Sequence, residues 1–207
     1  MIIRAIRQTG SEHITLLTDD GQEIATTLGI VTELRLFAGK PLEEAQLRLL
    51  QEKSAAAFAR EKALNLLSLR PHSQKELRDK LIRKGTEPAS AEAAIGWLTE
   101  HGYLDDAAYA SAVARHYAKK GYGARRITAE LQRRGIAREL WDEALQELPE
   151  PDAEIDRFLR SRLRNPDDAN KVRKATAALS SRGYSWDEIR SALNRLAAAA
   201  EDDADGV

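Results

Sequence analysis

The chain repeats one pattern of apolar residues three times, counted from Gly85, Gly135 and Gly183. A lysine or arginine stands directly before each glycine, and a leucine stands four residues before it. Apolar residues also occupy the positions eight before and six, nine, ten and thirteen after each glycine. The last four offsets match the buried stripe of an amphipathic helix, and the earlier two mark the stripe of a preceding helix. The positions in register are Leu77, Leu81, Ala91, Ala94, Ile95 and Leu98; Ile127, Leu131, Trp141, Ala144, Leu145 and Leu148; and Ala175, Leu179, Ile189, Ala192, Leu193 and Leu196.

The glycines and several polar residues predict where these helices end and begin. A glycine after the last turn accepts the left-handed conformation that closes a helix, and the cation before it suits the negative end of the helix dipole. Ser73 with Glu76, and Ser185 with Glu188, have the spacing of a capping box. Asn165-Pro166 predicts another helix start, with asparagine as the cap and proline in the first turn.

Each repeat also has room for a leading helix, and we expect these helices over 55–69, 105–119 and 152–163. The repeating unit is therefore three helices of about 45–50 residues. One such unit can bury only a small core, so neighbouring units are expected to stack. We predict a mostly α fold, in which three tandem three-helix repeats form an elongated curved array behind a small N-terminal β-hairpin unit.

The first 28 residues differ from the rest, because they carry three short β-branched runs: MIIRAI, HITLLT and EIATTL. Asp20-Gly21 lies between the last two runs and favours a tight hairpin turn. From about Leu42 the sequence favours helix, with Pro41 suited to a first helical turn. The predicted domains are a β-rich unit over 1–40, a linker helix over 41–56, three-helix repeats over 57–104, 105–150 and 151–200, and an acidic tail over 201–207.

The composition and motifs exclude several classes of function. There is no cysteine, which excludes disulfides, thiolate zinc sites and cysteine nucleophiles. The four histidines lack metal-ligand spacing, and neither a phosphate-binding loop nor a serine-nucleophile motif is present. Gly121 and Gly123 form only a GxG, which we interpret as a loop and helix start. We therefore expect no enzymatic activity, no cofactor and no metal site.

The chain also shows no sign of a membrane or export segment. No apolar run approaches the roughly 20 residues of a membrane span. The start, MIIRAIRQTGSEH, is not typical of a signal peptide, because its apolar run is short and interrupted by arginine. We expect a cytoplasmic protein that is a monomer and does not contact a membrane.

Charge is strongly segregated along a chain whose formal net charge is only −1. Residues 115–138 hold eight basic residues against one acid, Glu130, and residues 60–84 hold eight against three. Residues 147–156 hold five acids and no base, and the tail EDDADGV adds four acids. A positive surface of this kind suits an acidic partner, either nucleic acid phosphates or an acidic protein face.

Helical geometry predicts that part of this charge is displayed on one face. Arg126 and Arg133 are seven residues apart and project within about 20° of each other. Ile127 and Leu131 lie on roughly the opposite side, where they would pack. The alternative interpretation is an ordinary solvated helix face, and the high density of cations makes that interpretation weaker. Tyrosines at 103, 109, 117 and 122 bracket this helix and could stack on bases, although packing between helices is their commoner role.

The segment HGYLDDAAYASAVARHYAKKGYGARRITAELQRRGI (101–136) resembles the central signature of the RecX regulatory proteins. The segment ALNLLSLRPHSQKELRDKLIRKG (63–85) resembles the first repeat of that family, and the N-terminal unit resembles the leader of many members. The resemblance implies a regulator, not an enzyme, that binds the RecA recombinase filament on single-stranded DNA. It also implies inhibition of the ATPase, strand-exchange and coprotease activities of RecA, with roles in DNA repair, recombination and the SOS response.

We predict that the second repeat makes the main contact with the partner, where its cations could pair either with acidic residues of the filament or with nearby DNA phosphates. The candidate residues are Arg115, Lys119, Lys120, Arg125, Arg126, Arg133 and Arg134. Because every repeat keeps a cation before its glycine, Arg134 also has a structural role, which favours Arg125, Arg126 and Arg133 as functional residues. Gly102 to Asp105 match the signature, and we interpret them as the turn between the first two repeats, with Asp105 as a helix cap.

Two other functions remain open from the sequence. One is a helical DNA-binding module that acts through its basic face without an obligate protein partner, since a three-helix unit resembles helix-turn-helix geometry in outline. The other is a scaffold for an acidic protein unrelated to recombination. Steep salt dependence of binding to DNA alone would favour the first of these.

Overall fold

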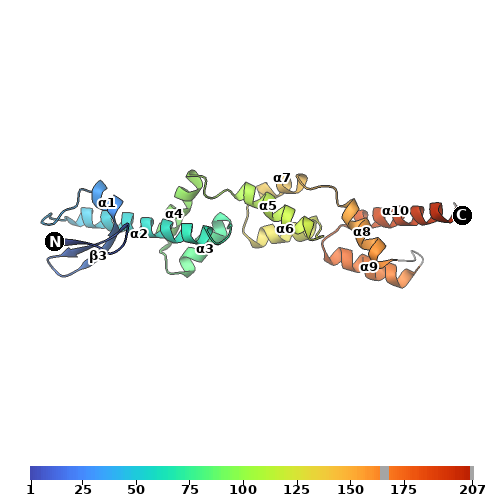
Figure 1. The fold of residues 1–207 in the computed structure, drawn as a ribbon, viewed down its shortest axis with the longest axis horizontal. Helices are drawn as coiled ribbons and strands as arrows, with labels where there is room; N and C mark the ends of the chain where they lie inside the picture. The colour runs from blue at the N-terminus through green and yellow to red at the C-terminus, as the bar shows by residue number, and fades with distance from the viewer. Residues whose placement is uncertain (164–167, 206–207) are drawn as a thin grey trace. The chain divides into compact units, whose positions relative to one another are not determined.

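The computed structural model describes the backbone of residues 1–163 and 168–205, and side chains as far as residue 199. The chain divides into two compact units, Met1–Asp105 and Asp106–Val207. The first unit carries all of the β structure described and the second is helical (Figure 1). Each unit is described on its own below.

The N-terminal β structure is a three-stranded antiparallel sheet of order β1-β2-β3. Its strands are β1 (Ile3–Gln8), β2 (His13–Thr18) and β3 (Glu23–Thr27). The predicted hairpin turn lies between β2 and β3, where Gly21 has a φ of 85° and the Thr18 N–H donates to the carbonyl oxygen of Gln22 at 3.0 Å. The prediction of a small β unit is therefore confirmed.

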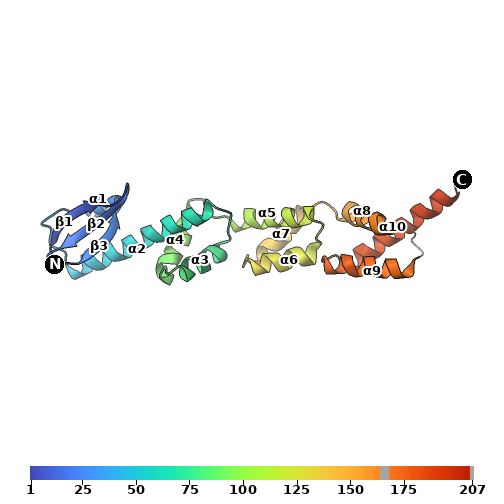
Figure 2. The same ribbon diagram turned by 60° about the horizontal axis from the view of Figure 1, so that its bottom comes forward.

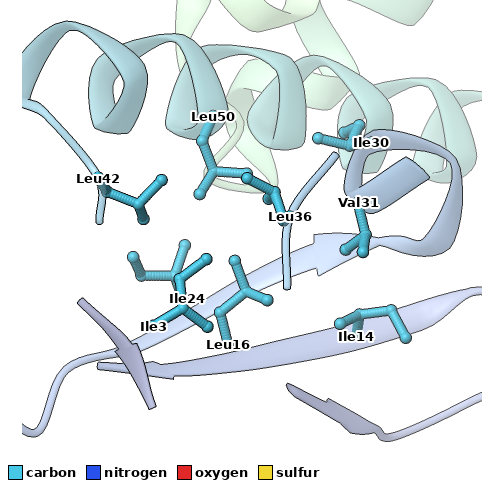
Figure 3. Close-up of a cluster of buried hydrophobic side chains, with 9 residues drawn as sticks. All are labelled: Ile3, Ile14, Leu16, Ile24, Ile30, Val31, Leu36, Leu42 and Leu50. Carbon is cyan, nitrogen blue, oxygen red and sulfur yellow. The ribbon is translucent and has the colours of Figure 1, made fainter. Parts of the chain in front are cut away.

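One face of the sheet is covered by helices and forms the first core (Figure 3). Along β2, buried residues alternate with half-buried ones, as expected for a strand with one packed face. Ile3 and Leu16 from the sheet meet Leu50 from the helix above it, and all three are fully buried. A short helix, α1 (Leu28–Glu33), adds Ile30 and Val31 to this core, and the sequence did not predict that helix.

A single long helix, α2 (Glu44–Leu67), joins the sheet to the helical part of the first unit (Figure 2). It packs against β3, where the buried hydroxyl oxygens of Ser54 and Thr26 are hydrogen-bonded at 2.8 Å. The predicted linker helix and the leading helix of the first repeat are thus one continuous helix. The prediction that Pro41 lies in its first turn is wrong, because Pro41 pairs with Ile2 in a β-bridge and Glu43 caps the helix.

The second half of α2 packs with α3 (Gln74–Arg83) and α4 (Pro88–Glu100) as the first three-helix group. Leu77, Leu81 and Leu98 are fully buried at its centre. The predicted capping box is present at α3: the Glu76 N–H donates to Ser73 Oγ at 3.0 Å, and the Ser73 N–H donates to the Glu76 carboxylate at 3.3 Å.

The second unit contains two further three-helix groups, each with its own core. The helices are α5 (Asp106–Lys119), α6 (Ala124–Arg133), the short 3₁₀ helix η1 (Arg138–Leu140), α7 (Trp141–Gln146), α8 (Asp152–Arg162), α9 (Ala169–Ser181) and α10 (Trp186–Asp205). The capping box at Ser185 is confirmed. The predicted cap at Asn165-Pro166 lies outside the described residues, and Asp168 caps α9 through the Lys171 N–H at 3.0 Å.

The three glycines that define the sequence register close three helices in the same way. Gly85, Gly135 and Gly183 have φ values of 81°, 68° and 94°. In each case the N–H of the next residue donates to the carbonyl of the leucine four residues before the glycine, at 3.0, 3.1 and 3.2 Å. This is the Schellman arrangement, which only a left-handed residue completes without steric cost. The eighteen positions in register are all buried or half-buried.

His72 lies just before α3 and is nearly fully buried. Its Nδ1 donates to the carbonyl oxygen of Arg70 at 2.9 Å, and its Nε2 faces Lys80 Nζ at 3.4 Å. Burial lowers the pKa of His72 below its usual 6.5, and the positive charges of Arg70 and Lys80 lower it further. The imidazole is therefore held neutral in the fold.

A pH titration of stability tests this role of His72. The unfolded chain binds a proton below pH 6.5 while the folded imidazole resists it, so stability is complete above that pH and falls as the pH drops below it. We expect urea unfolding of the wild type to lose free energy as the pH falls from about 7.5 to about 5.5, and His72→Gln to lose less. The control variant is His101→Gln, at an exposed histidine. Equal slopes of unfolding free energy against pH for the wild type and His72→Gln would contradict the assignment.

Candidate partner-binding surface

The basic helix α6 presents two arginines to solvent at its start. Ile127 and Leu131 are buried in the core, as the register predicts. Arg125 and Arg126 are exposed, and within the described part of the chain neither side chain has an ion pair or a side-chain hydrogen bond. They occupy the second and third helical positions, and the first turn of α6 holds no acidic residue. These two guanidinium groups are therefore available to a partner.

Arg133 and Arg134 are instead held by the one acid of the segment. Glu130 is buried and accepts from Arg133 Nη2 at 2.6 Å and from Arg134 Nε at 2.7 Å. The hydrogen bonds from Arg133 lower the pKa of Glu130 to about 2, against the opposing effect of burial and with further help from Arg134. Arg134 also donates to the Tyr109 hydroxyl and lies over that ring, at 5.6 Å from its centroid. Its structural role is thus larger than the helix-end register alone implied.

The cations of α5 divide in a similar way. Arg115 Nη1 donates to Glu147 at 2.9 Å, which links α5 to the residue that follows α7. Lys119 and Lys120 are exposed at the end of α5, and no ion pair holds either of them among the described residues. Lys120 Nζ lies 5.9 Å from the centroid of the Tyr117 ring. Four of the seven predicted cations, Lys119, Lys120, Arg125 and Arg126, therefore have no carboxylate partner in the described structure.

The start of α6 is fixed against the third three-helix group by two glycines. The Gly123 N–H donates to the carbonyl oxygen of Arg182 at 3.0 Å, and the Arg125 N–H donates to that of Gly183 at 3.2 Å. A Cβ on Gly123 would come within 2.6 Å of the Gly183 oxygen, and one on Gly183 within 2.4 Å of the Arg126 nitrogen. From the sequence we predicted only that Gly183 ends a helix. Its second role, close contact with the start of α6, joins segments about 60 residues apart, and the local residue pattern does not indicate that contact.

The four tyrosines that bracket the basic helix in the sequence mainly pack against protein. Tyr109 and Tyr117 pack against the core of the second group, and Tyr122 lies 5.6 Å from Tyr117 between ring centroids. Tyr103 is exposed but its ring stacks on Trp97 at 5.8 Å. Packing is thus the observed role of Tyr109, Tyr117 and Tyr122, as expected for tyrosines between helices.

The described residues contain no group of three or more metal-ligating side chains that could hold an ion. No described helix is long and apolar enough to cross a membrane.

Two cavities lie beside the junction of the second and third groups. The larger, of about 490 Å³, mixes Arg115 and Lys119 with Glu150, Glu154 and Glu188, and the smaller, of about 300 Å³, is predominantly basic.

Comparison with known proteins identifies the family of this chain. The sequence model described as RecX, first three-helix domain, matches residues 59–98, and the one described as RecX, second three-helix domain, matches 105–145. The regulatory protein RecX of Vibrio campbellii is 39% identical over 139 residues, which cover 66% of this chain and 90% of that protein. The chain belongs to the RecX family of regulatory proteins. The RecX of Xanthomonas axonopodis pv. citri is 40% identical over 135 residues, or 64% of this chain and 83% of that one.

Solved RecX structures show the same fold. A crystal structure of regulatory protein RecX aligns with a TM-score of 0.74 at 23% identity, covering 92% of this chain and 98% of that one. RecX from Lactobacillus salivarius aligns with a TM-score of 0.60 at 22% identity, covering 69% and 96%. The matched second RecX domain contains α5 and α6, so all seven predicted site residues lie within it. Their role in binding stays a prediction.

Glu130→Gln tests the ion-pair cluster under α6. Hydrogen bonds to a buried charged group contribute about 1.5–3 kcal/mol, so we expect a loss of about that size in the free energy of unfolding at pH 7. Because the folded pKa of Glu130 is depressed to about 2, its contribution is complete above the usual 4.5 and is lost as the pH falls from 4.5 toward 2. The difference between variant and wild type should shrink over that window. Exposed Glu139→Gln serves as the control, and an unchanged stability of Glu130→Gln at pH 7 would refute the role.

Gly183→Ala and Gly85→Ala separate the two roles of the repeat glycines. Both positions are left-handed, so each alanine should cost about 1–2 kcal/mol of stability. At Gly85 the added Cβ meets nothing within 4 Å, whereas at Gly183 it collides with Arg126. Thermal or urea unfolding should show a clearly larger loss for Gly183→Ala. Equal losses would mean that the contact with α6 is not tight in solution.

Proposed function

We propose that this protein binds the RecA recombinase filament on single-stranded DNA and inhibits its ATPase, strand-exchange and coprotease activities. In this role it acts as a cytoplasmic monomer in DNA repair, recombination and the SOS response. Membership of the RecX family supports regulation as the general function. The chemistry of the second domain supports an acidic partner surface.

The observation that carries the proposal is the placement of Arg125 and Arg126 at the positive end of α6. A helix N-terminus carries about half a positive charge, and acidic residues are the favoured ones there. Two arginines in that turn are unfavourable by about 0.3–1 kcal/mol each. The fold offers them no carboxylate within its described residues. A sequence that keeps an electrostatically costly pair on its surface is best explained by a partner that supplies the missing anions.

The chemistry of these groups also fits the partner proposed. A guanidinium binds a carboxylate or a phosphate oxygen pair through two parallel hydrogen bonds, so it recognises either an acidic protein face or DNA. In a RecA filament on DNA the phosphates are one such anion, and an acidic face of the protein would be the other. The backbone of α6 is fixed by the Gly123 and Gly183 contacts, so the two arginines are presented from a rigid base. Rigid presentation lowers the entropy lost on binding.

Arg125→Gln combined with Arg126→Gln tests the proposal through two opposite effects. Removing the charges should raise the stability of the second unit by a few tenths to about 1 kcal/mol per residue. The same variant should inhibit the DNA-dependent ATPase of RecA more weakly, with the half-inhibitory concentration rising roughly tenfold or more. ATP hydrolysis by RecA on single-stranded DNA is followed as the protein is titrated.

The matched control is Arg4→Gln combined with Arg7→Gln, which removes two exposed cations from the sheet. It should inhibit like the wild type. Absence of inhibition by the wild-type protein at micromolar concentration would overturn the function. Full inhibition by the Arg125 and Arg126 variant would leave the function standing and refute this choice of surface.

A further inference from the structure

The larger of the two cavities lies between the second and third groups, within the second unit. Its volume of about 490 Å³ is in the range of small-ligand sites. Apolar side chains make up much of its lining, among them Ile127 from α6 and Leu148, Pro149 and Pro151 from the segment that joins the two groups. The two prolines restrict the backbone on both sides of Glu150. The cavity is therefore a largely apolar space with one stiff wall.

Tyr184 lines this cavity with a hydroxyl that has no hydrogen-bond partner among the described residues. The residue is only 3% exposed. It follows Gly183, and the equivalent residues of the other two groups are Thr86 and Ile136. Because the apolar Ile136 fills this position in the second group, packing does not require a hydroxyl there. A buried hydroxyl without a partner costs free energy, and a ligand that bonds to it would offset that cost.

The surroundings of the Tyr184 hydroxyl are negatively charged. Burial raises its pKa above the usual 10.0, and the charges of Glu154 and Glu188 raise it further, against the opposing effect of Arg182. The hydroxyl therefore stays protonated at neutral pH, and its oxygen can accept a hydrogen bond from a cationic donor.

Two of the three carboxylates in the lining have no cationic partner among the described residues. Glu154 is bound by Arg157 at 2.9 Å. Glu188 accepts the backbone N–H of Ser185 at 2.5 Å, and Glu150 accepts no hydrogen bond within the described structure. Glu188 is half-buried, so water screens its charge less than it screens that of an exposed acid.

The cations of the lining compensate only part of this charge. Arg115 already donates to Glu147 at 2.9 Å. Lys119 is exposed at the end of α5, on the wall that the second group forms. The single unpaired ammonium stands against the two unpaired carboxylates, so one negative charge is left in excess. A cationic ligand is therefore favoured over an anionic one.

We propose that this cavity binds a small organic cation, an apolar molecule that carries a protonated amine, and that the amine donates to Glu188 and to the Tyr184 oxygen. The apolar part of the ligand lies against Ile127 and Leu148. Arg125 and Arg126 are not among the lining residues, so the site is separate from the candidate partner-binding surface. Its ligand is neither DNA nor an acidic protein, and the proposal holds whether or not RecA is inhibited.

The first experiment titrates the full, ¹⁵N-labelled chain with 4-phenylbutylamine at pH 7 and follows amide chemical shifts. We expect saturable shifts at the amides of Gly123, Ile127 and Tyr184. The carboxylate analogue 4-phenylbutyrate should bind roughly tenfold more weakly, because its charge has the wrong sign. Spermidine carries the positive charge without an aromatic body, and it should also bind more weakly because it buries less apolar surface.

Two variants test the residues that hold the amine. Tyr184→Phe removes only the hydroxyl, so we expect unchanged or higher stability but about three- to tenfold weaker binding of 4-phenylbutylamine. Glu188→Gln keeps a residue that can complete the capping box, and it should weaken binding by roughly tenfold or more. The matched control is Asp187→Asn, which removes the neighbouring exposed carboxylate outside the cavity and should bind the amine like the wild type.

Three results would overturn the proposal. Binding of 4-phenylbutyrate as tight as that of the amine would show that the carboxylates do not select the ligand. Equal losses of affinity in Glu188→Gln and Asp187→Asn would indicate diffuse attraction to the surface. A loss of stability in Tyr184→Phe with unchanged affinity would mean that the hydroxyl is paired within the fold and does not contact the ligand.

Discussion

The left-handed glycine at the end of a helix is the constraint on which each three-helix group depends. At Gly85, Gly135 and Gly183 the chain leaves one amphipathic helix and must reverse so that the next helix faces it. The hydrogen bond back to the buried leucine fixes that reversal within a single turn. The apolar stripes on both sides then meet at fixed offsets, which explains why the sequence register is so regular.

The same constraint positions the candidate surface in the second unit. Gly183 closes α9, and because it lacks a side chain the start of α6 can dock directly against it. Two backbone hydrogen bonds hold that contact, so the arginines of α6 and the cations at the end of α5 are placed by backbone geometry. A helix end, a junction between groups and a concentration of positive charge thus coincide in one short segment.

Much of this architecture could be predicted from the sequence because it is local. Helix stripes, capping boxes and left-handed glycines are all encoded within a few residues, and the β-branched runs predicted the strands. The predictions that failed or were incomplete involve partners far apart in the chain. Pro41 pairs with Ile2, and Gly183 meets Arg126. No local pattern of residue types indicates those contacts.

The ion pairs of the candidate surface also divide into those that local spacing could predict and those that only the fold reveals. Glu130 stands three and four residues before Arg133 and Arg134, so helical spacing alone could have paired them. A simple count of charges hid that pairing and made the surface look more positive than it is. Arg115 pairs with Glu147, 32 residues away, and only the fold reveals it. The remaining cations are those that the fold leaves without acids, and they are the better guide to function.

Hydrogen–deuterium exchange of this protein, with and without RecA filaments on single-stranded DNA, tests the central claim most directly. The account predicts that protection on binding concentrates over residues 115–134, where the unpaired cations and the docked start of α6 lie. Exchange in the sheet of the first unit should change little. Protection confined to the sheet, or no protection at all with saturating filament, would contradict the account.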